Sequence, residues 1–210
     1  MKKSESKSKI LNNVPDSKTA SAFLIVISAP SGCGKTTIVD RLLKRHADWV
    51  RSVSVTTRPP RTGEKSGQDY FFVDAGSFKK MVQENALLEH ARVFEQEYGT
   101  PKSFVMEQLA RGKKVILAID VQGTKEIKKR VDKDIPVFTI FVLPPSVKVL
   151  RERLEGRNTE SPEQIDKRVD VAQDEIKEAG HYDCTVINQT LDQSVQEIEE
   201  AIENFEKKGS

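Results

Sequence analysis

A glycine-rich turn between an apolar run and a helical pattern strongly constrains the fold of this chain. The run Phe23–Ser28 (FLIVIS) leads into the turn Ala29–Thr36 (APSGCGKT), and Ile38, Leu42 and Leu43 then recur at helical spacing. In such a turn, successive backbone N–H groups point inward and suit phosphate oxygens, as do those of a helix N-terminus. The segment therefore predicts a P-loop, with an ordinary strand-to-helix turn as the alternative.

Each residue type in this turn has a chemical reason to be there. Gly32 and Gly34 let the main chain approach phosphates closely, and Lys35 would neutralise charge between the β- and γ-phosphates. The Thr36 hydroxyl would ligate Mg²⁺. The consensus has glycine where this chain has Ala29, so the match is imperfect at that position. The predicted ATP-binding set is Ala29, Pro30, Ser31, Gly32, Cys33, Gly34, Lys35, Thr36 and Thr37.

Short apolar runs alternate with helical patterns along the rest of the chain. The runs do not alternate polar with apolar residues, as expected for parallel strands covered on both faces. They are Phe23–Ser28, Val115–Ile119, Val137–Leu143 and Cys184–Ile187. Repeated βαβ units predict an α/β fold, with a P-loop NTPase-type doubly wound parallel sheet as its core.

Helix ends support this pattern. Thr100 and Pro101 are predicted as the N-cap and first residue of one helix, which Gly112 closes. Ser161 with Gln164 predicts a capping box. Near the C-terminus, an apolar stripe at helical spacing predicts a helix that faces the core, formed by Val195, Ile198, Ile202 and Phe205.

Residues 53–100 do not fit the βαβ pattern. A strand that begins at Ser52 (Ser52–Thr56) is followed by a Pro- and Gly-rich loop (Arg58–Asp69) and an aromatic strand (Tyr70–Val73). A helical segment and a further strand-like run, Leu87–Phe94, come next. These patterns predict a mostly β insertion at 53–100. The rest of the domain 22–206 is divided into core segments 22–52, 101–150 and 171–206 and a lid at 151–170.

Composition narrows the range of partners. The chain has 34 Lys and Arg against 32 Asp and Glu, so a broad nucleic-acid-binding surface is not expected. No run of about 18 apolar residues is present, so a membrane partner is not expected either. Residues 1–21, with five lysines, are predicted as a disordered basic tail. Two cysteines indicate a reducing compartment, hence the cytoplasm.

The loop of the insertion carries a second cluster suited to phosphate. Arg58 and Arg61 are three residues apart and are stiffened by Pro59 and Pro60. Two guanidinium groups held in this way can clamp a dianionic phosphate, with a solvated basic loop as the alternative. Hydroxyl groups that could complete the clamp belong to Ser54, Tyr70 and Tyr98.

In the residues described above and in further motifs, the chain resembles the guanylate kinase family. The motifs SAPSGCGKTT, SVSVTTRPPRTGE with DYFFV, LLEHARVF, YGTP, IDVQG, PPS and RLEGRNTE follow the family's order. The resemblance runs from about Phe23 to Phe205 and covers the motifs for both substrates. It implies phosphorylation of GMP by ATP to give GDP, in purine nucleotide metabolism and GMP recycling, by in-line transfer with Mg²⁺.

The resemblance also implies roles for particular residues. It assigns Ser54, Arg58, Arg61, Tyr70 and Tyr98 to the GMP phosphate, and Glu89, Thr100 and Asp120 to guanine. It makes Arg157 and Arg168 the lid arginines that, with Lys35 and Arg58, form the catalytic set. Mg²⁺ would be held by Thr36, with Asp120 acting through water. The family usually has an acid where this chain has Ala118, which implies weaker metal binding here.

Two other functions are alternatives to the phosphorylation of GMP. One is a related kinase for another acceptor, such as a sugar phosphate, against which Glu89, Thr100 and Asp120 argue. The other is a non-enzymatic scaffold that binds phosphopeptides, against which Lys35 and Thr36 argue. The expected partners of the enzyme are ATP and GMP, with dGMP as a further acceptor. It is expected to act as a monomer or homodimer.

Overall fold

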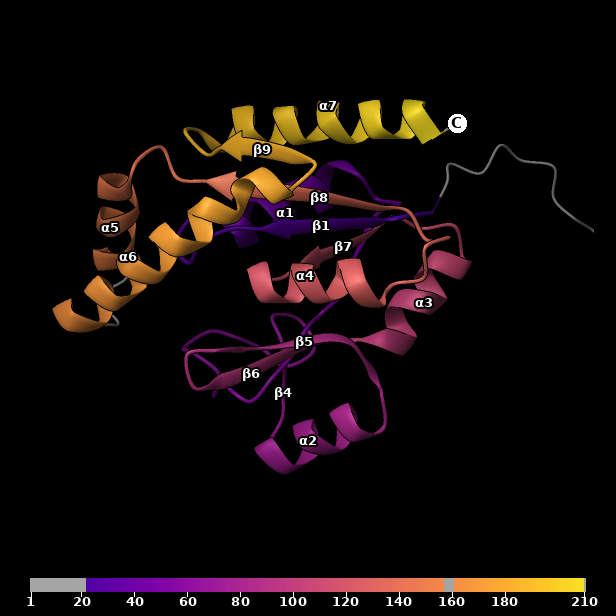
Figure 1. The fold of residues 1–210 in the computed structure, drawn as a ribbon, viewed down its shortest axis with the longest axis horizontal. Helices are drawn as coiled ribbons and strands as arrows, with labels where there is room; N and C mark the ends of the chain where they lie inside the picture. The colour runs from indigo at the N-terminus through magenta and orange to yellow at the C-terminus, as the bar shows by residue number, and fades with distance from the viewer. Residues whose placement is uncertain (1–21, 157–160, 210) are drawn as a thin grey trace, which may run out of the picture.

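The core of the molecule is a five-stranded sheet in which every neighbouring pair of strands is parallel (Figure 1). The computed structural model describes residues 22–156 and 161–209. The strand order is β2-β7-β1-β8-β9. The strands are β1 Leu24–Ser28, β2 Val50–Arg51, β7 Val115–Ala118, β8 Val137–Leu143 and β9 Cys184–Ile187. The four predicted core strands are confirmed, and β2 adds a fifth at the edge.

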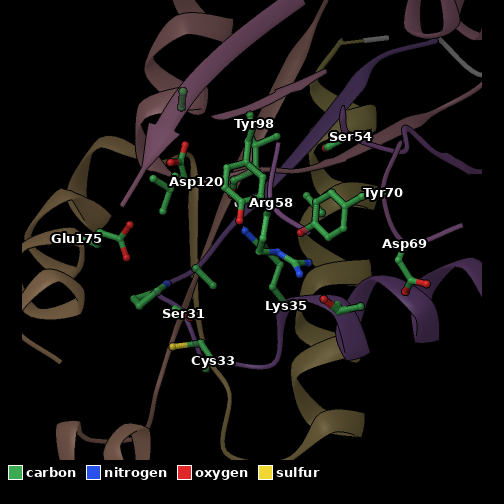
Figure 2. A pocket seen from close by; sticks show the side chains of 18 of the residues that line it. Ser31, Cys33, Lys35, Ser54, Arg58, Asp69, Tyr70, Tyr98, Asp120 and Glu175 are labelled. Atoms are coloured by element: carbon green, nitrogen blue, oxygen red, sulfur yellow. Dashed lines mark hydrogen bonds between the residues drawn. The ribbon is translucent and has the colours of Figure 1, made fainter. Parts of the chain in front are cut away.

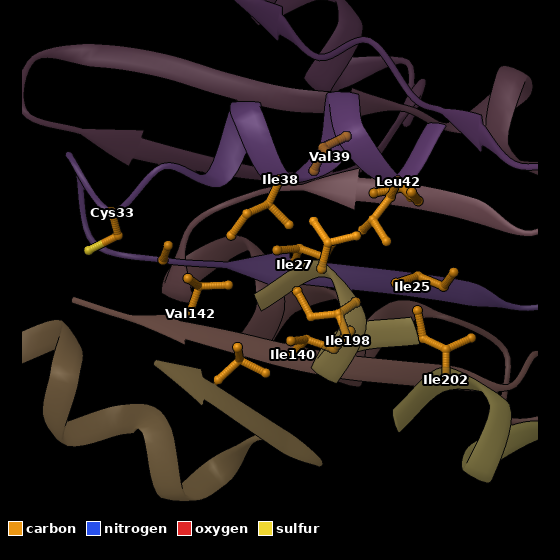
Figure 3. Packing of buried hydrophobic residues seen from close by; sticks show 14 of the residues in the cluster. Ile25, Ile27, Cys33, Ile38, Val39, Leu42, Ile140, Val142, Ile198 and Ile202 are labelled. Atoms are coloured by element: carbon orange, nitrogen blue, oxygen red, sulfur yellow. The ribbon is translucent and has the colours of Figure 1, made fainter. Parts of the chain in front are cut away.

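Helices cover both faces of this sheet. Successive side chains of a strand point to opposite faces, so each face carries apolar side chains that helices bury. Ile25 and Ile27 of β1 pack with residues of α1 (Lys35–Arg45) and α7 (Leu191–Gly209), as Figure 3 shows. Leu24 and Val26 of the same strand face the other way. They pack with residues of α3 and α4, which span Lys102–Ala110 and Val121–Arg130. The doubly wound parallel sheet is confirmed.

The C-terminal helix covers the core as predicted. Val195, Ile198 and Ile202 are buried, each with no more than 1% of its surface exposed. The ring of Phe205 lies 5.3 Å from that of Phe23 and 4.8 Å from that of Phe138. The apolar stripe of α7 is therefore part of the domain's own core.

A second sheet lies beside the core (Figure 1). Its strand order is β4-β3-β6-β5, with β3–β4 parallel and the other two pairs antiparallel. Its elements are β3 Val55–Thr56, β4 Phe71–Phe72, α2 Ala75–Gln83, β5 Leu87–Val93 and β6 Gln96–Pro101. Val55, Phe78 and Leu87 form its own small core. This sheet fits the predicted β insertion.

The predicted strand Ser52–Thr56 is wrong as one element. Arg51 ends β2 in the core sheet, whereas Val55 and Thr56 form β3 in the second sheet. The Ser52 N–H still donates to the Ile116 carbonyl at 3.0 Å, after which the chain leaves the core. One alternating run therefore contributes residues to two sheets. The aromatic strand, predicted as Tyr70–Val73, spans only Phe71–Phe72 in the structure.

The predicted start of the helix at Thr100 is also wrong. Thr100 belongs to β6, Pro101 occupies the N-cap position, and α3 begins at Lys102. The Thr100 hydroxyl donates to a buried carboxylate, Glu89, instead of capping the helix. A tertiary hydrogen bond has replaced the local one here.

The remaining helices approach the P-loop end of the core sheet. α5 (Val147–Glu155) and α6 (Pro162–Lys177) contain most of the residues predicted as a lid, 151–170, and a short 3-10 turn, Glu178–His181, follows them. The capping box of Ser161 and Gln164 is confirmed at the start of α6. No helix within the described part of the chain is long and apolar enough to cross a membrane. The predicted tail, 1–21, lies outside the described residues.

Candidate active site

The predicted P-loop connects β1 to α1 at the carboxyl end of the core sheet. Gly34 has φ +84° in the N-cap position of α1, a left-handed conformation that favours glycine. A Cβ atom there would lie 2.7 Å from Nδ2 of Asn188, which donates to the Cys33 carbonyl at 2.7 Å. Both the conformation and the packing of the turn therefore require glycine at this position.

Lys35 points from the start of α1 toward the end of β7. Its ammonium group donates to the Ile119 carbonyl at 2.8 Å. Burial lowers the pKa of Lys35, while the nearby Asp120 and Glu175 act in the opposite direction. The lysine is thus held at the edge of the P-loop, near the carboxylates of Asp120 and Glu175.

The loop of the insertion, Arg58–Asp69, is called the acceptor loop below, and it holds its first arginine in a fixed position. Nη2 of Arg58 donates to both carboxylate oxygens of Glu64, at 2.8 and 2.9 Å. The guanidinium lies 5.4 Å from the ring centre of Tyr70, whose ring packs edge-on against Tyr98 at 5.9 Å. Figure 2 shows Arg58 between these two tyrosines. Ser54 and Arg61 line the same cavity, so the predicted clamp is brought together.

A buried carboxylate lies deeper in the cavity. Glu89 on β5 is only 2% exposed, and its Oε1 accepts a 2.6 Å hydrogen bond from the Thr100 hydroxyl. Burial is the main cause that raises the pKa of Glu89 to about 7, and Asp120 adds to it. A Cβ at Gly123 would lie 2.6 Å from Oε2 of Glu89, so glycine leaves the space that this carboxylate occupies.

Asp120 combines a structural contact with a place in the cavity. It is the N-cap of α4, where its Oδ1 accepts from the Gly123 N–H at 2.7 Å. Its carboxylate also lines the cavity, together with Ala118 of β7. The negative charge of Asp120 therefore acts to raise the pKa of both Lys35 and Glu89.

Arg168 brings the lid side of the molecule to the P-loop. From α6, its Nη1 donates to the Ser31 hydroxyl at 2.7 Å, and its guanidinium stacks 5.3 Å from the ring centre of Phe94. Phe94 is exposed at the turn of the β5–β6 hairpin, where its φ is +47°. Arg157, the other predicted lid arginine, lies outside the described residues.

Four charged residues of the cavity are absent from the predicted set, namely Arg51, Glu64, Asp69 and Glu175. Glu175 lies on α6, and burial raises the pKa of its carboxylate to about 7. Figure 2 shows Glu175 and Asp120 on one side of the cavity, with Tyr70 and Asp69 on the other. The spacing of seven residues from Arg168, two helical turns, is the signal that could have found Glu175. Arg51 is the last residue of β2, and Glu64 and Asp69 belong to the loop Arg58–Asp69 of the insertion.

These groups surround one cavity of about 340 Å³. Every residue of the predicted ATP-binding set lines it. So do Ser54, Arg58, Arg61, Tyr70, Glu89, Tyr98, Asp120 and Arg168 from the other predicted sets. Thr100 contributes through its hydrogen bond to Glu89. One cavity thus joins the phosphate turn to the arginine clamp and the buried carboxylate.

The oxygen ligands that the cavity offers fit a magnesium ion that is bound together with a nucleotide. Within residues 22–156 and 161–209, no three His, Cys, Asp or Glu side chains gather as a metal site. Mg²⁺ usually needs no such cluster, because substrate phosphates and waters supply most of its ligands. The Thr36 hydroxyl and the Asp120 carboxylate both line the cavity, as oxygen donors of the kind that Mg²⁺ prefers.

The fold and this site together define a P-loop nucleotide-binding protein of the α/β class. The family model described as guanylate kinase matches residues 21–205. The chain belongs to the guanylate kinase family.

Individual relatives agree with this family. A guanylate kinase from Wolbachia sp. subsp. Brugia malayi (strain TRS) is 46% identical over 187 residues, which are 89% of this chain and 95% of the relative. One from Coxiella burnetii is 44% identical and covers 84% of each chain. The crystal structure of guanylate kinase from Anaplasma phagocytophilum has a TM-score of 0.74 and 30% identity, covering 89% of this chain and 87% of that one.

Proposed function

We propose that this member of the guanylate kinase family transfers the γ-phosphoryl group of ATP to GMP, giving ADP and GDP. A single observation carries the proposal: the cavity that contains the P-loop also contains a paired-arginine clamp and a buried carboxylate. The P-loop suits the triphosphate of ATP, and the clamp suits the phosphate of the acceptor.

Glu89 would select guanine. The Watson–Crick edge of guanine offers two adjacent donors, N1–H and the N2 amino group, which one carboxylate can accept together. Adenine has an unprotonated N1 at that place, so lone pairs would oppose the carboxylate. In a desolvated site, a mismatch of this kind discriminates by about 10⁴. The hydrogen bond from Thr100 orients Glu89 for this contact.

The transfer itself would depend on position and positive charge rather than on a general base. Arg58 would release Glu64 to grip the acceptor phosphate together with Arg61. Lys35 would leave the Ile119 carbonyl for the transferring phosphoryl group. Arg168, already beside Ser31 of the P-loop, would neutralise charge on the equatorial oxygens.

We place Mg²⁺ in this proposal with the Thr36 hydroxyl as its protein ligand and Asp120 acting through water. When bound, the ion neutralises charge on the β- and γ-phosphate oxygens of ATP. Both residues line the cavity beside Lys35, which supports this assignment.

The partners and location follow from the same proposal. We expect ATP and GMP as substrates and dGMP as a further acceptor, with the chain acting as a monomer or homodimer. The near balance of 34 basic and 32 acidic residues supports a protein that needs neither nucleic acid nor a membrane surface. Two cysteines are too few for a disulfide framework, which supports the cytoplasm.

The proposal is tested by a coupled assay of ADP formation with ATP and a panel of acceptors. GMP should support turnover, with dGMP next, whereas AMP and UMP should be poorer by a factor of about 10⁴ in kcat/KM. AMP turnover equal to that of GMP would contradict guanine selection. Turnover with none of the four acceptors would contradict the proposed reaction.

Guanine binding should weaken as the pH falls below 7. The pKa of Glu89 is raised to about 7, so below that pH the free protein holds a neutral acid that has lost an acceptor site. Bound guanine favours the ionised form, because its two donors face the carboxylate. The Kd should therefore rise by up to about tenfold for each pH unit below 7.

Calorimetric titration with guanosine measures this effect cleanly. Guanosine lacks the phosphate of GMP, whose second pKa of about 6 would add its own pH dependence. The Glu89→Gln variant, which has no titrating group at this position, should bind guanosine too weakly for calorimetry at every pH. The same slope in the variant as in the unmodified protein would contradict the assignment.

Replacing Arg168 with alanine should lower kcat more than it raises KM. The guanidinium would stabilise charge that develops in the transition state, and loss of one such group costs about 10²- to 10³-fold in kcat. Steady-state kinetics for both substrates measures the split, with Arg151→Ala as a control on the lid side that forms an exposed pair with Asp166. A change confined to KM would instead assign Arg168 to ground-state binding.

A further inference from the structure

Arg51 lies where the chain leaves the core sheet for the second sheet. It ends β2, the edge strand beside β7, and its side chain is only 16% exposed. It lines the same cavity as the P-loop and the arginine clamp. An arginine this far buried requires partners, since desolvating an unpaired charge is costly.

The contacts of Arg51 join two parts of the site that are far apart in the sequence. Its Nη2 donates to the backbone carbonyl of Asp69 at 3.2 Å, and its Nη1 lies 3.8 Å from the Asp40 carboxylate. Asp40 belongs to α1, the helix that begins at the P-loop. Asp69 belongs to the acceptor loop and immediately precedes Tyr70. The guanidinium therefore bridges the P-loop helix and the acceptor loop.

This bridge fixes one carbonyl of the acceptor loop relative to the core sheet. The Asp69 side chain is directed back along its own loop, accepting from the Lys65 N–H at 2.8 Å. The carbonyl of Asp69 is thus left as the group that Arg51 can hold. Moving this carbonyl would move Tyr70, whose ring contacts both Arg58 and Tyr98. Figure 2 shows Asp69 and Tyr70 together on one side of the cavity.

Stability alone does not account for this placement. Nε of Arg51 is buried and has no hydrogen-bond partner among the described residues. A buried N–H without a partner destabilises the fold, so a residue with an apolar side chain would suit a purely structural role better.

We propose that Arg51 is a positioning residue that holds the acceptor-phosphate clamp at a set distance from the P-loop. This inference rests on the proposed function, because the clamp is the part of the site that receives GMP. It predicts a defect specific to GMP, since Arg51 holds the acceptor loop and not the phosphate turn. A shift of about 1 Å between reacting groups can cost about 10²-fold in rate.

The decisive variant is Arg51→Met, which keeps an unbranched stem but removes every donor. The KM for GMP should rise about tenfold and kcat should fall, while the KM for ATP stays within about twofold. Arg51→Lys, which keeps the charge and one donor group for the Asp69 carbonyl, should restore much of the loss. Arg45→Met is the matched control, because Arg45 also lies near β2 in sequence but pairs with Glu199 on α7.

Hydrogen exchange tests the bridge without reference to activity. Amides at 67–73 should exchange faster in Arg51→Met than in the unmodified protein, while those of β1 and β8 stay unchanged. Unchanged exchange at 67–73, or equal rises in KM for both substrates, would overturn the inference. An unmodified protein that does not phosphorylate GMP would contradict the proposed function alone, since the exchange result would still decide whether Arg51 holds the loop.

Discussion

Lys35→Ala should lower kcat by about 10³-fold or more while the protein stays folded. The ammonium group is the cation that the P-loop itself supplies, and it already lies at the rim of the turn, bonded to the Ile119 carbonyl. In the proposed mechanism it meets charge that grows on the transferring phosphoryl group. Its removal therefore acts on the transition state more than on the bound substrates.

Steady-state kinetics, combined with thermal unfolding, checks this expectation. The melting temperature of Lys35→Ala should stay close to that of the unmodified protein, because removing a buried charge also removes its desolvation cost. Lys44→Ala is the control, since Lys44 lies on the same helix and is exposed. A Lys35→Ala enzyme with near-normal turnover would defeat the P-loop assignment.

Glu89→Gln should lose about 10³- to 10⁴-fold in kcat/KM for GMP and change the Kd of ATP by less than about twofold. Glutamine has the same shape and can still accept from Thr100. Its amide, however, turns a donor toward the donors of guanine. The defect should therefore be confined to the acceptor.

The measurement pairs GMP kinetics with direct binding of ATP to each variant. Glu84→Gln provides a matched control, because Glu84 occupies the C-cap position of α2 in the same insertion and forms an exposed pair with Lys80. Equal losses for both nucleotides in Glu89→Gln would indicate general damage to the site. They would count against guanine recognition by this carboxylate.

Local sequence predicted the parts of the molecule that local chemistry determines. The P-loop was predictable because Gly34 must adopt a left-handed conformation, and few other residue types allow it. β1, β7 and β8 were predictable because strands buried on both faces are largely apolar, whereas β9 lies at the edge of the sheet and buries only Val186. The capping box of Ser161 and Gln164 satisfies backbone groups within one turn, so its sequence pattern is explicit.

The predictions that were wrong or missing concern residues whose structure depends on contacts between distant segments of the chain. Thr100 has the sequence signature of a helix cap, yet its hydroxyl bonds to Glu89, eleven residues earlier. Ser52–Thr56 has one alternating pattern, but the partners that divide it, Ile116 and Gly99, lie far along the chain. Arg51 and Glu175 join the cavity through tertiary packing; Arg51 carries no local motif, and Glu175 is marked only by its spacing of seven residues from Arg168.

The central claim is that the acceptor's purine meets Glu89 while its phosphate meets Arg58 and Arg61. A crystal structure of the protein with GMP bound tests it most directly. The account predicts N1 and N2 of guanine within about 3 Å of the Glu89 carboxylate oxygens, and the phosphate bonded to both arginines. A base bound away from Glu89, with the phosphate outside the clamp, would contradict it.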